Sequence, residues 1–189
     1  MSVEIEGRII NINPEETRDK ITKLGAKQVG FYNFKRYTFD SIPKVDGRWG
    51  RLRTDGKNTT LTLKEIINDS LSGTNEWEIT VSDFKETLII LEKLGLLHQS
   101  YQENTRDDFI IEDTKISIDH WPQLGYILEI ESKKEEDVKK YCKEYLPFLN
   151  EEDFDDEDKA DYFHLCKVYG ENEKLIALGI VYNYHNGYY

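Results

Sequence analysis

Four short segments of the sequence place two like charges on either side of a single apolar residue. They are Glu4-Ile5-Glu6, Arg51-Leu52-Arg53, Glu76-Trp77-Glu78 and Glu129-Ile130-Glu131. Because alternate residues of a β-strand point to opposite faces of a sheet, each segment directs both charges to one face. One such strand is an ordinary solvated edge. Four of them, carrying both signs of charge, predict a closed sheet whose charged interior holds divalent metal ions and a polyanion together.

The overall composition restricts the partners that we expect. The formal net charge of −12 over 189 residues repels nucleic acid, so an anionic ligand needs a local basic cluster. No apolar run reaches membrane-spanning length and no signal-peptide pattern opens the chain, so we expect no membrane partner. Cys142 and Cys166 lack metal-ligand spacing and are expected to be reduced, as in a cytoplasmic protein. The length suits one domain over residues 1–189.

Hydrophobic patterns and turn residues predict the elements that position these charges. Helices are expected at 14–24, 84–94 and 133–146, where Asn13, Asp83 and Ser132 are suitable capping residues. Strands are expected at 2–11, 29–40, 50–54, 58–66, 75–81, 100–111, 114–120 and 126–131. An acidic loop at 151–161, a last helix ending near Gly170 and a short strand at 175–182 complete the expected order.

Two expected hairpins give a test of the charged interior. A turn centred on Asp55-Gly56 pairs Arg53 with Asn58 and Arg51 with Thr60, which places both arginines on the face of Lys64. A turn at Glu112-Asp113 pairs Arg106 with Asp119, on a face that also holds Asp108, Lys115 and Ser117. Each hairpin is therefore predicted to be charged on one face and apolar on the other.

The order of elements also indicates an internal duplication. Lys23-Leu24-Gly25 and Lys93-Leu94-Gly95 each end a helix that follows a Glu-x-Glu strand. An arginine follows each glycine at the same spacing, at Arg36 and Arg106. Two related halves, each a strand, a helix and further strands, would close into one barrel.

The ordered set of motifs resembles the CYTH superfamily, the triphosphate tunnel metalloenzymes. The family signature Glu-x-Glu-x-Lys reads Glu4-Ile5-Glu6-Gly7-Arg8 here, followed by GRLRTDGKNTTLTLKE, NEWEIT, Arg106 and IDHWPQLGYILEIE. The resemblance spans residues 4–131. It implies an α+β fold, an eight-stranded antiparallel β-barrel that forms a tunnel, with helices packed on the outside. It also implies enzymes that act on a small-molecule triphosphate with Mg²⁺ or Mn²⁺.

The resemblance and the charge pattern together assign candidate residues. The expected metal ligands are Glu4, Glu6, Glu129 and Glu131, with Glu76, Glu78 and Asp119 completing a second site or holding waters. The expected triphosphate contacts are Arg51, Arg53, Lys64 and Arg106, with Arg8 at the edge and Arg36 as a further candidate. Arg8 and Lys64 are the candidate catalytic residues. Arginine at position 8 keeps the charge of the family's lysine but cannot lose a proton. The bland alternative is that these charges form ion pairs on solvated strands.

Three functions remain open from the sequence. Hydrolysis of a nucleoside, thiamine or inorganic triphosphate requires water to attack the terminal phosphorus. Cyclisation of ATP, as in class IV adenylate cyclases, requires the ribose 3′-hydroxyl to attack the alpha phosphorus and expel pyrophosphate. A tunnel that only binds polyphosphate or a nucleotide is the third, and Arg8 in place of lysine favours it. We expect a monomer or a homodimer.

Overall fold

The computed structural model describes residues 2–10, 12–68, 71–122 and 124–144. The side chains of residues 2–4, 10, 143 and 144 are outside this description, and that of Glu4 is among them. The expected acidic loop, last helix and strand at 175–182, as well as Cys166, also lie outside the described residues.

One antiparallel sheet contains all the described strands, in the order β1-β6-β5-β4-β3-β7-β8-β9-β2. The strands are β1 (Ser2–Glu4), β2 (Glu6–Ile10), β3 (Lys27–Asp40), β4 (Arg48–Thr54), β5 (Thr59–Ile66), β6 (Thr74–Val81), β7 (His98–Ile111), β8 (Thr114–Trp121) and β9 (Gly125–Glu131). The helices are α1 (Pro14–Lys23), α2 (Phe84–Lys93) and α3 (Glu135–Glu144). None of these helices is long and apolar enough to span a membrane.

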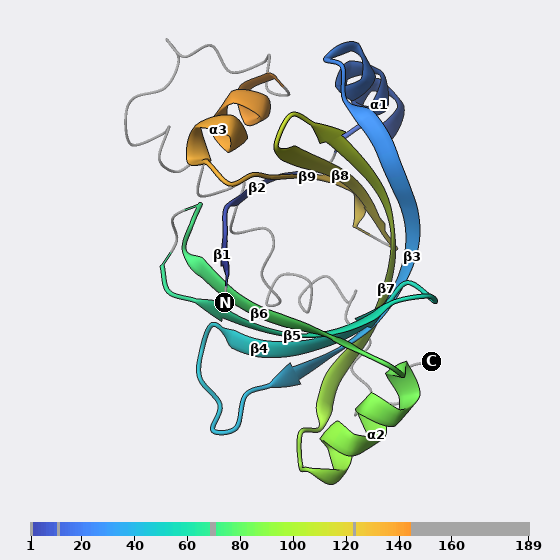
Figure 1. Cartoon of the computed structure of the whole chain (residues 1–189), viewed down its shortest axis with the longest axis vertical. Helices are drawn as coiled ribbons and strands as arrows, with labels where there is room; N and C mark the ends of the chain where they lie inside the picture. Colours follow the sequence, from blue (N-terminus) through green and yellow to red (C-terminus); the bar gives the residue numbers. More distant parts are fainter. Residues whose placement is uncertain (1, 11, 69–70, 123, 145–189) are drawn as a thin grey trace.

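The amino-terminal strand closes this sheet into a tunnel. We expected one strand at 2–11, but it is interrupted at Ile5, so that β1 pairs with β6 and β2 pairs with β9. The Ile5 carbonyl accepts from the Ser132 amide at 3.1 Å, and the Glu6 amide donates to the Leu71 carbonyl at 3.3 Å. The interruption thus lets one strand join both edges of the sheet. With β1 and β2 counted as the one interrupted strand, the expected eight-stranded antiparallel tunnel is confirmed, and its helices lie outside the ring of strands (Figure 1).

The main apolar core lies outside the tunnel, between the outer face of β7–β9 and the helices α1 and α3. Its members include Ile21, Ile116, Leu128, Ile130, Val138 and Cys142. Gly7 on β2 permits this packing, because a Cβ there would lie 2.9 Å from Cys142 Sγ and 3.1 Å from Val138 Cγ1. Burial of the outer face of β7–β9 under α1 and α3 leaves their opposite face to the interior.

The expected caps and hairpins are confirmed in part. Asn13 caps α1 and Asp83 caps α2, whereas α3 begins at Glu135 rather than at residue 133. Arg106 pairs with Asp119 as predicted. In the first hairpin, Arg53 pairs with Thr60 and Arg51 with Thr62, two residues away from the prediction. The Asp55 carboxylate accepts from the Lys57 and Asn58 amides at 2.8 and 2.6 Å, which stabilises a longer turn.

Candidate functional site

The strand register places the predicted charges on the inner face of the tunnel. On one wall Glu6 lies opposite Glu131, and Glu129 lies between Arg8 on β2 and Ser117 on β8. The two-residue shift of the first hairpin does not change which face its residues occupy, since an even shift preserves the strand alternation. Arg51, Arg53 and Lys64 therefore share a second wall with Glu76 and Glu78.

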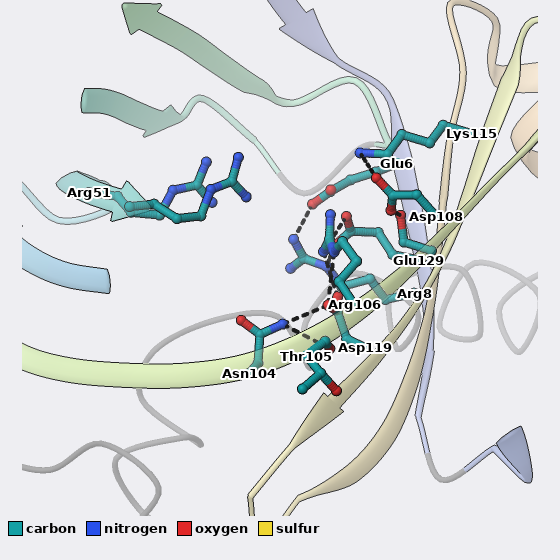
Figure 2. A network of polar contacts seen from close by, with 12 residues as sticks. Glu6, Arg8, Arg51, Asn104, Thr105, Arg106, Asp108, Lys115, Asp119 and Glu129 are labelled. Carbon is teal, nitrogen blue, oxygen red and sulfur yellow. Dashed lines mark hydrogen bonds and ion pairs between the residues drawn. The ribbon is translucent and has the colours of Figure 1, made fainter. Parts of the chain in front are cut away.

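A continuous polar network crosses the first wall (Figure 2). Arg8 contacts Glu6 at 2.6 Å and Glu129 at 3.0 Å. Arg106 contacts Glu129 at 2.9 Å and donates from Nε to Asp119 Oδ1 at 2.8 Å. Glu129 thus bridges two guanidinium groups. At the edge of the network, Asp108 accepts from Ser117 at 2.7 Å and pairs with Lys115 at 3.3 Å.

Two neighbouring glutamates of this wall have opposite electrostatic surroundings. Burial alone would raise the pKa of Glu129, but the charges of Arg106 and Arg8 hold this pKa well below its usual value. Burial raises the pKa of Glu131, and the carboxylates of Glu129 and Glu6 raise it further, while Lys115 acts in the opposite direction. The negative charge of the three crowded carboxylates, Glu6, Glu129 and Glu131, is therefore compensated by arginines at Glu129. At Glu131 the compensation is incomplete.

The second wall holds more widely spaced ion pairs. Arg51 lies 3.4 Å from Glu76 and 3.7 Å from Glu78, Arg53 lies 3.9 Å from Glu78, and Lys64 lies 3.8 Å from Glu76. Burial opposes the ionisation of Glu78, yet a 2.7 Å hydrogen bond from Thr62 and the charges of Arg53 and Arg51 hold its pKa below the ordinary value.

Arginine side chains gather where the two walls meet across β3. Burial and the charges of Arg51 and Arg53 lower the pKa of Arg36 well below its usual value. Burial and the charges of Arg51 and Arg106 lower the pKa of Arg53 to about 10. The Nε groups of Arg36 and Arg51 are buried and make no hydrogen bond within the described part of the chain. Cationic donors that repel one another and retain unused N–H groups are suited to an anion.

The donor chemistry of the first wall fits a divalent cation. Mg²⁺ and Mn²⁺ take carboxylate oxygens, and the crowding that raises the pKa of Glu131 is relieved by positive charge. Within the described residues, however, no group of three or more His, Cys, Asp or Glu side chains is arranged to hold a metal ion. Arg8 contacts both Glu6 and Glu129, so it supplies the neutralising charge there. A metal site on these residues remains a prediction.

The structure brings most, but not all, of the candidate residues together. Glu6, Arg8, Arg106, Asp119 and Glu129 form the network of the first wall, next to Glu131. Glu76 and Glu78 instead lie among Arg51, Arg53 and Lys64. Glu4 can be placed only by its backbone, which pairs with Thr74.

Asn104 is an interior residue that was not among the site residues predicted from the sequence. Asn104 is buried and donates to Asp119 Oδ1 at 2.7 Å. It lies two residues before Arg106 on β7, so strand alternation alone could have placed it on the inner face. Asn104 carries no charge, so the charge pattern of the sequence does not indicate it.

Comparisons with known proteins agree with this architecture. The family model of the CYTH domain matches residues 2–163. A solved protein from Pyrococcus horikoshii is 23% identical with a TM-score of 0.67, covering 82% of this chain and 93% of its own. A Vibrio parahaemolyticus protein described as a candidate adenylate cyclase is 13% identical, with a TM-score of 0.61 and coverages of 75% and 83%.

A third similar structure is a candidate adenylyl cyclase from Hippeastrum described as having a dominant triphosphatase activity. It is 15% identical, with a TM-score of 0.54, and the match covers 76% of this chain and 86% of that chain. At these identities the likeness concerns the fold. None of the curated proteins matches the sequence significantly.

Proposed function

Because this chain belongs to the CYTH domain family, we propose that it is a divalent-metal-dependent enzyme that hydrolyses a triphosphate inside its tunnel. The family comprises triphosphatases and adenylate cyclases, so an enzyme acting on a triphosphate is the common expectation. One observation supports the proposal most strongly: a single interior contains crowded carboxylates on one wall and crowded arginines with unused N–H groups on the other. Such an interior suits a polyanion bound together with a cation.

The chain's own residues would bind and orient the substrate. Arg36, Arg51 and Arg53 would hold the phosphate oxygens, and Arg106 would fix Asp119 and Glu129 in place. Glu6, Glu129 and Glu131 would hold Mg²⁺ or Mn²⁺, which when bound would neutralise phosphate charge and lower the pKa of water. Burial and the neighbouring Glu129 and Glu6 raise the pKa of Glu131, so a bound cation would relieve the crowding of this carboxylate.

Arg8 and Lys64 would position other groups and would not accept a proton. Arg8 is held between Glu6 and Glu129, and Lys64 contacts Glu76, so both would set the positions of carboxylates and balance charge. An arginine cannot serve as the base at position 8. This feature favours the binding-only alternative. The description of the Vibrio parahaemolyticus structure as a candidate adenylate cyclase makes cyclisation the second enzymatic candidate, whereas the dominant triphosphatase activity described for the Hippeastrum protein favours hydrolysis.

Product analysis separates these functions. The purified protein would be incubated with ATP, tripolyphosphate and thiamine triphosphate, each with Mg²⁺, with Mn²⁺ and without metal. We expect phosphate release that depends on metal. Cyclic AMP with pyrophosphate would establish cyclisation instead. Binding without turnover of any of the three would leave a sensor as the function and refute the enzymatic proposal.

A further inference from the structure

Asn104 connects two charged groups at the centre of β7. It is 4% exposed, its Oδ1 accepts a hydrogen bond from Arg36 Nη2, and its Nδ2 donates to Asp119 Oδ1 at 2.7 Å (Figure 2 shows Asn104 and Asp119). A guanidinium group can only donate and a carboxylate can only accept, so these two partners fix the orientation of the amide. Asn104 is therefore held rigidly between Arg36 and Asp119.

The charge of Asp119 is already balanced by another residue. Arg106 donates to both Asp119 oxygens, from Nε at 2.8 Å and from Nη2 at 2.5 Å. Among the described side chains, no carboxylate forms an ion pair with Arg36. Its guanidinium instead lies over the Trp121 ring, 4.6 Å from the ring centroid, and its Nε makes no hydrogen bond there. Arg106 thus has a carboxylate partner, whereas Arg36, on the same interior face, contacts a neutral amide and an aromatic ring.

The neutral amide leaves the charge of Arg36 without a paired carboxylate among the described side chains, and Asp119 offsets part of it only from a distance. An aspartate at position 104 would have nearly the same shape, and one of its oxygens would pair with Arg36 directly. Its other oxygen would replace the donor to Asp119 Oδ1 and be repelled there, so the aspartate would turn toward Arg36. A buried cation without a carboxylate partner is costly, and here Arg51 and Arg53 add their repulsion. A polyanion entering the tunnel relieves this cost, whereas a guanidinium group that is already paired gains less from it.

We propose that Asn104 is a positioning residue that holds Arg36 through a neutral acceptor, so that the charge of Arg36 remains available for a phosphate group of the substrate. The inference rests on the proposed binding of a triphosphate and assigns the roles within it. Arg106 is the arginine that maintains the wall, and Arg36 is the arginine reserved for the ligand. Asn104 separates the two because it gives Arg36 a neutral acceptor while Asp119 pairs with Arg106, so the charge of Asp119 acts on Arg36 only from a distance.

Three variants test this assignment. N104D supplies a charged acceptor, N104L removes both hydrogen bonds while leaving Arg36 charged, and N33D adds the same charge at an exposed position of β3. Binding of tripolyphosphate is measured by calorimetry without divalent metal, and thermal unfolding is measured for each protein. We expect N104D to weaken binding roughly ten- to a hundred-fold, which is the range for losing a charge-assisted contact. N104L should weaken binding less than N104D, although it unfolds at the lower temperature, and N33D should bind as the wild type does.

The order of affinities decides between positioning and a merely structural role. If affinity follows stability, so that N104L binds more weakly than N104D, Asn104 only supports the fold and the inference is overturned. If N104D binds tripolyphosphate as tightly as the wild type does, the inference is also overturned, but the proposed function is not affected. Metal-dependent turnover by a wild type that does not bind metal-free tripolyphosphate overturns the inference alone. If the wild type neither binds nor hydrolyses the triphosphate, both the inference and the proposed function are refuted.

Discussion

Glu131 is a carboxylate whose surroundings oppose its ionisation. Burial raises its pKa, as do Glu129 and Glu6, so the folded state holds this proton more tightly than the unfolded state does. Stability therefore falls as pH rises from the ordinary glutamate pKa through the raised one. We expect E131Q to unfold at a higher temperature than the wild type near neutral pH, with the difference vanishing in acid. Thermal unfolding from about pH 4 to about pH 8 would measure this.

Glu135 gives a control of opposite sign. It is half-buried on α3, and a hydrogen bond from Ser72 lowers its pKa. E135Q should therefore lose stability above the ordinary glutamate pKa, where E131Q gains it. If E131Q were less stable than the wild type at neutral pH, the carboxylate crowding inferred for the first wall would be wrong. The stability gained by E131Q should come with loss of Mg²⁺-dependent stabilisation.

Arg53 is the residue at which the basic wall can be tested directly. Its pKa is lowered to about 10 by burial, Arg51 and Arg106, so R53A relieves repulsion in the empty tunnel but removes a phosphate contact. We expect roughly ten- to a hundred-fold weaker binding of both ATP and tripolyphosphate, with little change in stability. Calorimetry with both ligands measures this.

Arg48 provides the matched control on the same strand. It lies on the outer face of β4, where it pairs with Glu65, so R48A should leave the affinity for both ligands unchanged. A loss confined to ATP in R53A would mean that Arg53 contacts the nucleoside, and its assignment to phosphate would be contradicted.

At the scale of elements, α3 packs against the wall that carries Glu6 and Arg8. Gly7 lies between these residues and faces α3, where a Cβ would lie 2.9 Å from Cys142 Sγ. G7A should therefore destabilise the protein by about 1–3 kcal/mol through overpacking. Combining G7A with C142A, which removes the sulfur, should cost less than the sum of the single substitutions. Denaturant unfolding of the four proteins of the cycle measures this coupling. Additive costs would show that the Cys142 side chain does not limit residue 7.

The same elements show which features could be read from the sequence. Strand alternation predicted the interior position of Glu129 and of the arginines on β4, because it depends only on the chain itself. The turn at Asp55 was predicted two residues too short, because its carboxylate binds the Lys57 and Asn58 amides. The interruption at Ile5 depends on contacts with Leu71 and Ser132, which are distant in sequence. The role of Asn104 could not be predicted from the sequence, because it depends on contacts with Arg36 and Asp119, which only the structure shows.

At the scale of the whole molecule, the tunnel contains two halves with the same order of elements, and each half contributes a strand that pairs with the other half. The same separation relates Pro14 to Phe84, Gly25 to Gly95 and Arg36 to Arg106. Each half begins with a strand that pairs with the other half, β2 with β9 and β6 with β5. The halves are similar in order but not in charge. Glu129 and Glu131 on β9 stand where β5 carries Thr62 and Lys64, so one closed tunnel acquires an acidic wall and a basic wall.

This division predicts that a metal ion and a polyanion bind cooperatively. Glu129 contacts both Arg8 and Arg106, at 3.0 and 2.9 Å. A cation on the Glu129 carboxylate leaves the charge of these two guanidinium groups uncompensated until a polyanion binds nearby. A polyanion held by Arg36, Arg51 and Arg53 in turn adds negative charge to the tunnel, which a cation on the carboxylates offsets. Each ligand therefore removes a cost imposed by the other. Mg²⁺ and a hydrolysis-resistant imido analogue of tripolyphosphate together should raise the unfolding temperature by more than their separate effects combined.

E129Q distinguishes this coupling from complex formation in solution. The variant lacks the charge that links the two ligands, whereas Mg²⁺ associates with the analogue equally in both experiments. The excess stabilisation should be larger in the wild type by about 1–3 kcal/mol, the usual size of a coupling free energy between two sites. Thermal unfolding with each ligand alone and with both, for the two proteins, supplies the comparison. Equal excess stabilisation in both would place the coupling in the solution complex, and the tunnel would then bind the two ligands independently.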